Sequence, residues 1–150
     1  MLASVAVADG PTRPWIDRAF ALVALAAVLA LVVMLARVTP DPRGYATHEA
    51  LGLTACGWPQ IYGKPCPTCG VTTAACWLVH GSPFRALSTQ PFGALAMATL
   101  LWIAGFALWS LARGRSFLLP FLLLPLMRGF GGTILVFLLA WLWKYETFVP

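Results

Sequence analysis

The sequence has little charge. Only 10% of its 150 residues are charged, whereas an ordinary soluble domain carries about 25%. Hydrophobic residues make up 60% of the chain, above the roughly 45–50% that such a domain uses. A single soluble core cannot absorb this excess, so the composition predicts an integral membrane protein whose first partner is the lipid bilayer.

The sequence also lacks a clustered basic face. Its net charge is +5, but the ten Lys and Arg residues are scattered and mostly flank apolar runs. A nucleic-acid-binding surface needs such residues gathered together, so no nucleic-acid partner is predicted. Basic residues beside apolar runs are instead typical of anchors at a membrane surface.

Several catalytic signatures are missing as well. The sequence has no phosphate-binding loop, no serine-nucleophile motif, and no histidine inside an apolar run that could hold haem. Glu49 has no evident second group with which to share acid–base work. These absences favour a protein that is not an enzyme.

Three apolar runs predict transmembrane helices, since about 20 apolar residues cross the hydrocarbon core of a bilayer. They cover approximately residues 18–38, 91–112 and 124–145. The first is too long for the core of a signal peptide and is followed by no small-residue cleavage site. Arg128 lies among glycines in the third, and we expect it near an interface because a mid-bilayer arginine costs at least about 2.5–3.5 kcal/mol.

The predicted fold is therefore an all-α membrane protein. Residues 1–17 form an N-terminal tail, and residues 18–150 form a single membrane domain with a cysteine loop and short helix at 39–90. Within that loop, Pro67 to His80 predicts one helix with Cys66 as its cap, too short to span and so interfacial or re-entrant. Arg113 and Arg115 in a short loop favour a cytoplasmic N-terminus, with the cysteine loop outside.

The chemistry-bearing residues are confined to this loop. All four cysteines and both histidines fall between His48 and His80. Cys66 and Cys69 form a C-x-x-C pair at the predicted helix start, where the helix dipole is expected to lower the pKa of a thiol. Cys76 would lie two turns beyond Cys69, about 10 Å along the helix, so these two cannot share one metal ion.

Three roles fit the cysteines. The first is a structural zinc site of His48, Cys56, Cys66 and Cys69, because one His and three Cys form a recognised zinc ligand set. The second is a redox pair of Cys66 and Cys69 with Cys56 as exchange partner, although the βαβ pattern of a thioredoxin fold is missing. The third is packing or a structural disulfide, and packing is the expected role of Cys76. The sequence leaves these three roles open.

The string CPTCGVTTAACWLVHG, with HEALGL and CG before it and PFRAL and QPFG after it, resembles a known family. This is the family of small bacterial membrane proteins called domain of unknown function 2752, whose hallmark is CP-x-CG-x-T followed by N-P-x-G. Members often carry arginine where this chain has Thr73, and asparagine where it has Gln90. We expect structural roles at Pro67, Gly70, Thr72, Pro91 and Gly93, which match the hallmark, and at Thr73 and Gln90, where this chain departs from it.

The resemblance covers roughly residues 47–145 and implies a three-span protein of the bacterial cytoplasmic membrane, but it implies no activity. From the residues we predict a small non-catalytic subunit of a larger membrane complex. Its Cys/His loop would be a docking element, rigid in itself or stabilised by zinc. The alternative is a membrane thiol–disulfide redox protein that uses Cys66 and Cys69.

Overall fold

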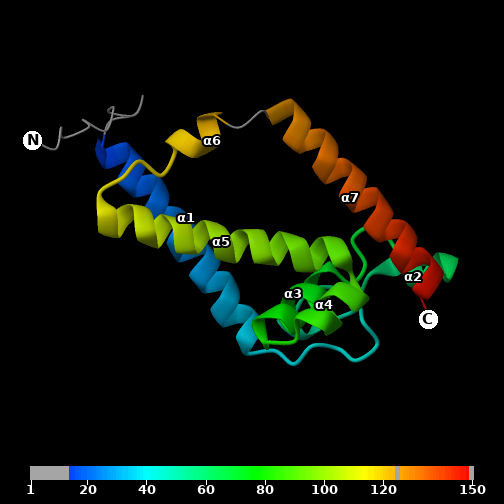
Figure 1. Cartoon of the computed structure of the whole chain (residues 1–150). Helices are drawn as coiled ribbons and strands as arrows, with labels where there is room; N and C mark the ends of the chain where they lie inside the picture. Colours follow the sequence, from blue (N-terminus) through cyan, green and yellow to red (C-terminus); the bar gives the residue numbers. More distant parts are fainter. Residues whose placement is uncertain (1–13, 124–125, 149–150) are drawn as a thin grey trace, which may run out of the picture.

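The computed structural model describes residues 14–123 and 126–148, and within these ranges every regular element is a helix (Figure 1). Two long helices dominate, α1 (Pro14–Ala36) and α5 (Pro91–Arg113). Each has 23 residues and is about 35 Å long at 1.5 Å per residue. Both have the length and apolar composition to cross a membrane. The all-α prediction is confirmed for the described residues.

The first helix begins earlier than the sequence predicted. We placed residues 14–17 in the N-terminal tail, but α1 starts at Pro14 and includes Asp17 in its first turn. Both residue types suit a helix start, because proline presets the backbone angle of the first turn and an acidic group interacts favourably with the helix dipole. Residues 1–13 of the predicted tail lie outside the described part of the chain.

The two long helices cross and pack through small residues (Figure 1). Ala21 of α1 and Ala107 of α5 are almost fully buried together with Phe117, which follows α5. Small side chains at such a crossing let two backbones approach closely. A second buried cluster, of Leu35, Cys76 and Met97, joins the end of α1 to the short helices described next.

Residues 39–90 form short elements between α1 and α5, which are a 3₁₀ turn (Glu49–Leu51), α2 (Gly57–Tyr62), α3 (Val71–Val79) and α4 (Pro83–Thr89). Of these, α3 and α4 lie together at the start of α5, and α2 lies near the end of α7 (Leu126–Thr147) (Figure 1). The start of α5 presses against α3, since a Cβ added at Gly93 would lie 2.8 Å from the carbonyl oxygen of Val71. Only glycine fits this contact without a shift of backbone.

The helix predicted from Pro67 is wrong at its start, because α3 begins at Val71. The preceding residue, Gly70, has φ of +84°, a left-handed conformation that interrupts an α-helix. The CPTC string therefore lies in a turn before the helix. Cys66 caps no helix, and the expected effect of a helix dipole on its pair does not apply.

The chain ends in α6 (Leu119–Leu123) and α7 (Leu126–Thr147). The third predicted span coincides with α7, but among the described residues only α1 and α5 meet the length and composition of a membrane span. The third span therefore stays a prediction. The side chain of Arg128, which we expected near an interface, lies outside the described part.

Two sets of contacts hold the ends of these helices in place. Near the start of α1, the buried Asp17 carboxylate accepts hydrogen bonds from Ser116 Oγ and the Phe117 N–H, both at 2.8 Å, and from the Leu118 N–H at 3.0 Å. Near the end of α7, the Trp141 indole N–H donates to the Pro65 carbonyl at 3.4 Å. The start of α1 thus meets the end of α5, and the end of α7 meets the cysteine loop.

Candidate thiol site

The CPTC string folds as a tight turn. The Cys69 N–H donates to the Cys66 carbonyl at 2.9 Å, and the Val71 N–H donates to the Thr68 carbonyl at 3.2 Å. A bond between residues three apart defines a β-turn, in which the two Cα atoms lie within about 7 Å. A disulfide needs Cα atoms about 4.4–6.8 Å apart. The turn therefore holds Cys66 and Cys69 at a separation compatible with a bond between their sulfurs.

Gly70 closes this turn and admits no other residue without strain. Its φ of +84° disfavours any residue with a Cβ. A Cβ added there would also lie 2.7 Å from the carbonyl oxygen of Gly44, well inside van der Waals contact. The segments around residues 44 and 70, far apart in sequence, touch through their backbones at this point.

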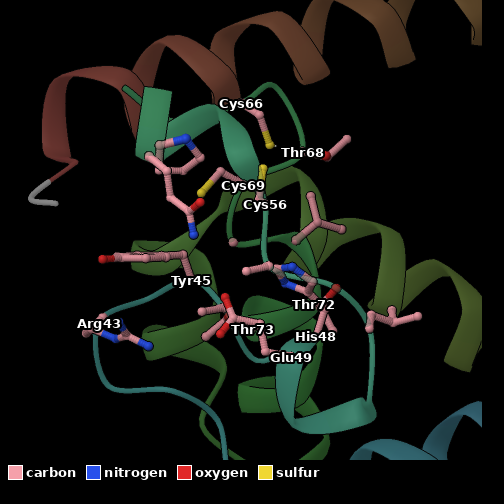
Figure 2. A pocket seen from close by; sticks show the side chains of 17 residues that line it. Arg43, Tyr45, His48, Glu49, Cys56, Cys66, Thr68, Cys69, Thr72 and Thr73 are labelled. Atoms are coloured by element: carbon pink, nitrogen blue, oxygen red, sulfur yellow. Dashed lines mark hydrogen bonds between the residues drawn. The ribbon is translucent and has the colours of Figure 1, made fainter. Parts of the chain in front are cut away.

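A third thiol reaches the turn from a different segment. Cys56 is the N-cap residue of α2, with an extended backbone that turns the chain toward the CPTC string. Its thiol lines the same pocket as those of Cys66 and Cys69. Figure 2 shows the three sulfurs gathered at one end of a pocket. All cysteines in the structure are free thiols.

The three thiols differ in accessibility, and the pKa of both Cys56 and Cys69 is raised. Cys56 and Cys66 are half-buried, whereas Cys69 is 7% exposed. Burial, and next the neighbouring Cys66, raise the pKa of the Cys69 thiol to about 11, while the positive charge of Lys144 opposes this rise. Burial also raises the pKa of Cys56, with a further contribution from Cys66. Cys66 lies close enough to influence the pKa of both Cys56 and Cys69.

The thiols line an open pocket of about 570 Å³ (Figure 2). His48, Glu49 and Arg43 belong to its wall, and Thr72 and Thr73 line it from the first turns of α3. Thr73 is almost fully buried, and its hydroxyl has no hydrogen-bond partner in the structure. The pocket thus combines thiols, both signs of charge and an unpaired hydroxyl.

The four predicted zinc ligands, His48, Cys56, Cys66 and Cys69, all line this pocket. Within residues 14–123 and 126–148, however, no group of three or more His, Cys, Asp or Glu side chains is arranged to hold a metal ion. The structure brings the predicted ligands to one place without assembling them as a coordination shell. The zinc site therefore stays a prediction.

Lys144 is a residue that the sequence did not single out. It lies in the last turn of α7, is 5% exposed, and donates to the Gly44 carbonyl at 3.0 Å. In the described part of the chain its ammonium group makes no ion pair with a carboxylate. The Cys69 thiol is the ionisable group that interacts electrostatically with this ammonium group. The sequence signal was a lone lysine at the end of an apolar run, which is also the pattern of an ordinary membrane anchor.

The remaining predicted positions shape the backbone around the site. Gln90 is the N-cap of α5, where its side-chain oxygen accepts a hydrogen bond from the Phe92 N–H at 2.9 Å, and Pro91 takes the first helical position. Pro67 occupies the second position of the CPTC turn, where proline presets the backbone angle. These residues shape the backbone and bring no reactive group to the pocket.

Cys76 and His80 lie elsewhere. The fully buried Cys76 thiol points at the end of α1, with the Val38 and Leu35 carbonyl oxygens at 3.2 and 3.4 Å. His80 ends α3, and its Nδ1 lies 2.9 Å from the Cys76 carbonyl oxygen. We expected Cys69 and Cys76 two turns apart on one helix, but Cys69 precedes the helix and lines the pocket. Cys76 is a packing residue, as the sequence indicated.

Comparison with known proteins matches one part of the chain, which includes the site, to a family. Residues 56–104 match the family described as "Protein of unknown function (DUF2752)". This confirms the DUF2752 resemblance. The matched segment begins at Cys56 and contains the whole CPTC turn, α3, α4 and the first part of α5, so all three pocket thiols lie within the DUF2752 region. No curated protein and no solved structure matches the chain.

Proposed function

We propose that this DUF2752 chain is a membrane-anchored thiol–disulfide exchange protein. The observation that carries the proposal is one pocket lined by three free thiols from two segments, in which half-exposed Cys66 shares a tight turn with buried Cys69. Exchange needs an accessible thiol that attacks first and a second thiol within reach that resolves the mixed disulfide. The arrangement supplies both.

In the proposed reaction the Cys66 thiolate attacks one sulfur of a substrate disulfide. The Cys66–substrate bond forms, the substrate S–S bond breaks, and the departing thiolate takes up a proton. Cys69 then loses its proton, attacks the Cys66 sulfur and releases the second substrate thiol. The substrate gains two electrons and two protons, and the chain is left with a Cys66–Cys69 disulfide. A dithiol protein of the same compartment restores the reduced form by the same exchange.

Cys69 is suited to the second step because it is buried and protonated until a mixed disulfide forms beside it. A resolving thiol of high pKa does not compete for the substrate. The ammonium group of Lys144 favours the Cys69 thiolate when it forms. Cys56, which lines the same pocket, provides a second resolving thiol.

We further propose that the chain crosses the bacterial cytoplasmic membrane three times. The contacts of Asp17 bring the start of α1 and the end of α5 to one side, and those of Trp141 and Lys144 bring the end of α7 to the opposite side, with the cysteine loop. Helices α1, α5 and α7 would then cross in alternating directions. The N-terminus would be cytoplasmic and the thiol site outside, as the short Arg113–Arg115 loop indicated.

Trapping of a mixed disulfide tests the exchange reaction on the full-length, detergent-solubilised protein. With 2-hydroxyethyl disulfide as probe, the wild-type chain is expected to become two mass units lighter, through an internal bond. Cys69→Ser combined with Cys56→Ser should instead retain a mercaptoethanol adduct on Cys66. Cys76→Ser is the matched control, because Cys76 lies outside the pocket and should not change the outcome.

Two results would contradict the exchange proposal. The first is equal modification of all four cysteines, with no internal disulfide in the wild-type chain. The second is one zinc ion per chain that blocks alkylation of the pocket thiols until a chelator is added. That result would support the structural zinc site of His48, Cys56, Cys66 and Cys69 in its place.

An accessory role in a larger membrane complex is a second candidate, supported by a different observation. Gly129, Gly131 and Gly132 lie on an exposed part of α7, where an added Cβ would meet nothing within 4 Å. Glycines of this kind allow another helix to approach closely in a bilayer. If α7 docks a subunit there, Gly131→Leu should remove a stoichiometric partner without changing the reactivity of Cys66. Purification of the wild-type chain and of the Gly131→Leu variant as monomers would argue against this role.

A further inference from the structure

The pocket beside the thiols has the dimensions of a small-molecule site. Its volume of about 570 Å³ falls within the roughly 300–1,000 Å³ of such sites. The thiols occupy one end, and the wall below them carries ionisable and hydroxyl side chains (Figure 2). A ligand that reaches Cys66 therefore has to lie against these groups.

The wall carries one positive and one negative side chain. Arg43 is held in place by Asp41, which accepts from its Nε at 3.1 Å and its Nη2 at 2.8 Å, and it lies 5.0 Å from the Tyr45 ring centroid. Its Nη1 makes no hydrogen bond among the described residues. Glu49 is exposed and makes no ion pair in the same ranges, yet it is close enough to act on Arg43.

The floor of the pocket carries an unsatisfied hydroxyl. Thr73 is 1% exposed, and its Oγ1 is buried without a partner. An unpaired buried hydroxyl is unfavourable by about 1–3 kcal/mol, so buried hydroxyls almost always have a partner. A polar group of a bound ligand would satisfy it.

We propose that the substrate is a low-molecular-weight disulfide whose ends carry both an amino and a carboxylate group. Arg43 would receive a carboxylate, Glu49 an ammonium group, Thr73 a polar atom of the ligand, and Cys66 the disulfide. The inference rests on the proposed exchange function and adds its substrate class. The reaction balances as before: the disulfide becomes two thiols, and the chain gains one internal disulfide.

Four symmetrical disulfides of similar size test this assignment on the full-length reduced protein. L-Cystine carries both charges, cystamine only the ammonium groups, 3,3′-dithiodipropionate only the carboxylates, and 2-hydroxyethyl disulfide neither. Each rate of Cys66 modification is divided by the rate at which free mercaptoethanol reacts with the same disulfide. The corrected rate with cystine should exceed that with 2-hydroxyethyl disulfide by about tenfold or more, the factor that 1.4 kcal/mol represents.

Substitutions in the wall should change the selectivity in different ways. Arg43→Gln should lower the corrected preference for cystine and for dithiodipropionate, whereas Glu49→Gln should lower the preference for cystine and for cystamine. Matched controls are Arg85→Gln, since Arg85 lies over the Trp77 ring outside the pocket, and Glu146→Gln near the end of α7. Neither control should change the order of the four rates.

The outcomes separate the two proposals. Equal corrected rates for all four disulfides, or wall variants that behave as their controls do, would overturn the substrate class and leave the exchange function standing. If no disulfide reacts with Cys66 in the wild-type chain, both proposals are overturned. The reaction of Cys66 with the neutral disulfide also reports whether each wall variant has kept its fold.

Discussion

At the scale of single residues, the site depends on three thiols in three environments. Cys66 is partly exposed on the CPTC turn, Cys56 is partly exposed at the start of α2, and Cys69 is buried. The sequence identified the C-x-x-C pair and named Cys56 as an exchange partner. It could not rank the three thiols by accessibility, because burial is a property of the packed chain. The helix-dipole argument predicted a lowered pKa for Cys69, whereas burial raises it.

Alkylation of the folded protein should follow this ranking. At pH 8 a thiol of pKa about 11 is ionised in only about one molecule in a thousand, so Cys69 should react far more slowly with iodoacetamide than Cys66. Its labelling should rise between about pH 9 and pH 11, since the reactive thiolate forms in that interval. Peptide mass spectrometry at several pH values measures both rates. Fast labelling of Cys69 at pH 8 would contradict its assigned burial.

Thr73 offers a second prediction at this scale. Thr73→Val replaces an unpartnered buried hydroxyl with a methyl group of similar size. The apo protein should therefore gain up to about 1–3 kcal/mol of stability, the range for an unsatisfied buried group. The same variant should react more slowly with cystine. Thermal unfolding and exchange rates measure the two effects, and a loss of stability would show that the hydroxyl is satisfied in the native protein.

At the scale of elements, the site is held by close backbone contacts between segments far apart in sequence. The CPTC turn meets the segment at Gly44, α3 meets α5 at Gly93, and α7 reaches back to Gly44 through Lys144. The glycines and prolines of the family motif shape these contacts. Their role is to place the thiols, while the thiols carry the chemistry.

Gly93 and Gly105 form a matched pair on α5. A Cβ at Gly93 would lie 2.8 Å from both the Cα and the carbonyl oxygen of Val71, whereas one at Gly105 would meet nothing within 4 Å. Gly93→Ala should therefore destabilise the fold by about 1–3 kcal/mol, the usual result of overpacking. Gly105→Ala should be neutral or stabilising by up to about 1 kcal/mol, because alanine is the better helix former. Thermal unfolding in one detergent compares them, and equal shifts would refute the α3–α5 contact.

Asp17 provides the corresponding test for α1. Its carboxylate accepts three hydrogen bonds from residues 116–118. Asp17→Ala should leave the two backbone N–H groups without their acceptor and lower stability by about 1–3 kcal/mol. Ser116→Ala, which removes only one of the three bonds, should lower it by less. Hydrogen exchange of the Phe117 and Leu118 amides should rise in the first variant, and unchanged protection would contradict the contact.

At the scale of the whole molecule, the contacts at the helix ends predict which segments share a side of the membrane. Epitope tags inserted after Gly81 and Gly114 are suitable reporters, because an added Cβ at either glycine meets nothing within 4 Å. The tag after Gly81 and a C-terminal tag should be accessible from one side, and the tag after Gly114 from the other. A C-terminal tag on the same side as Gly114 would mean that α7 does not cross.

Much of the architecture was predictable from the sequence. The helices at residues 18–36 and 91–112 follow from long apolar runs, which can satisfy their backbone only as helices in a bilayer. The boundaries that failed were set by single residues. Pro14 and Asp17 extended α1 into the predicted tail, and the left-handed Gly70 delayed α3 until Val71. Such boundaries depend on tertiary contacts that no periodicity reveals.

The sequence by itself determined the all-helical class, the resemblance of residues 56–104 to DUF2752 and the region that carries the chemistry. Apolar composition, the CPTCG string and the confinement of every cysteine to residues 48–80 are local properties of the chain. Only the tertiary structure decided which residues share the pocket. Cys56 reaches Cys66 and Lys144 reaches Gly44 because the start of α2 and the end of α7 converge on one turn. Burial and proximity arise from that convergence, and they determine which thiol is accessible to a substrate and which is buried.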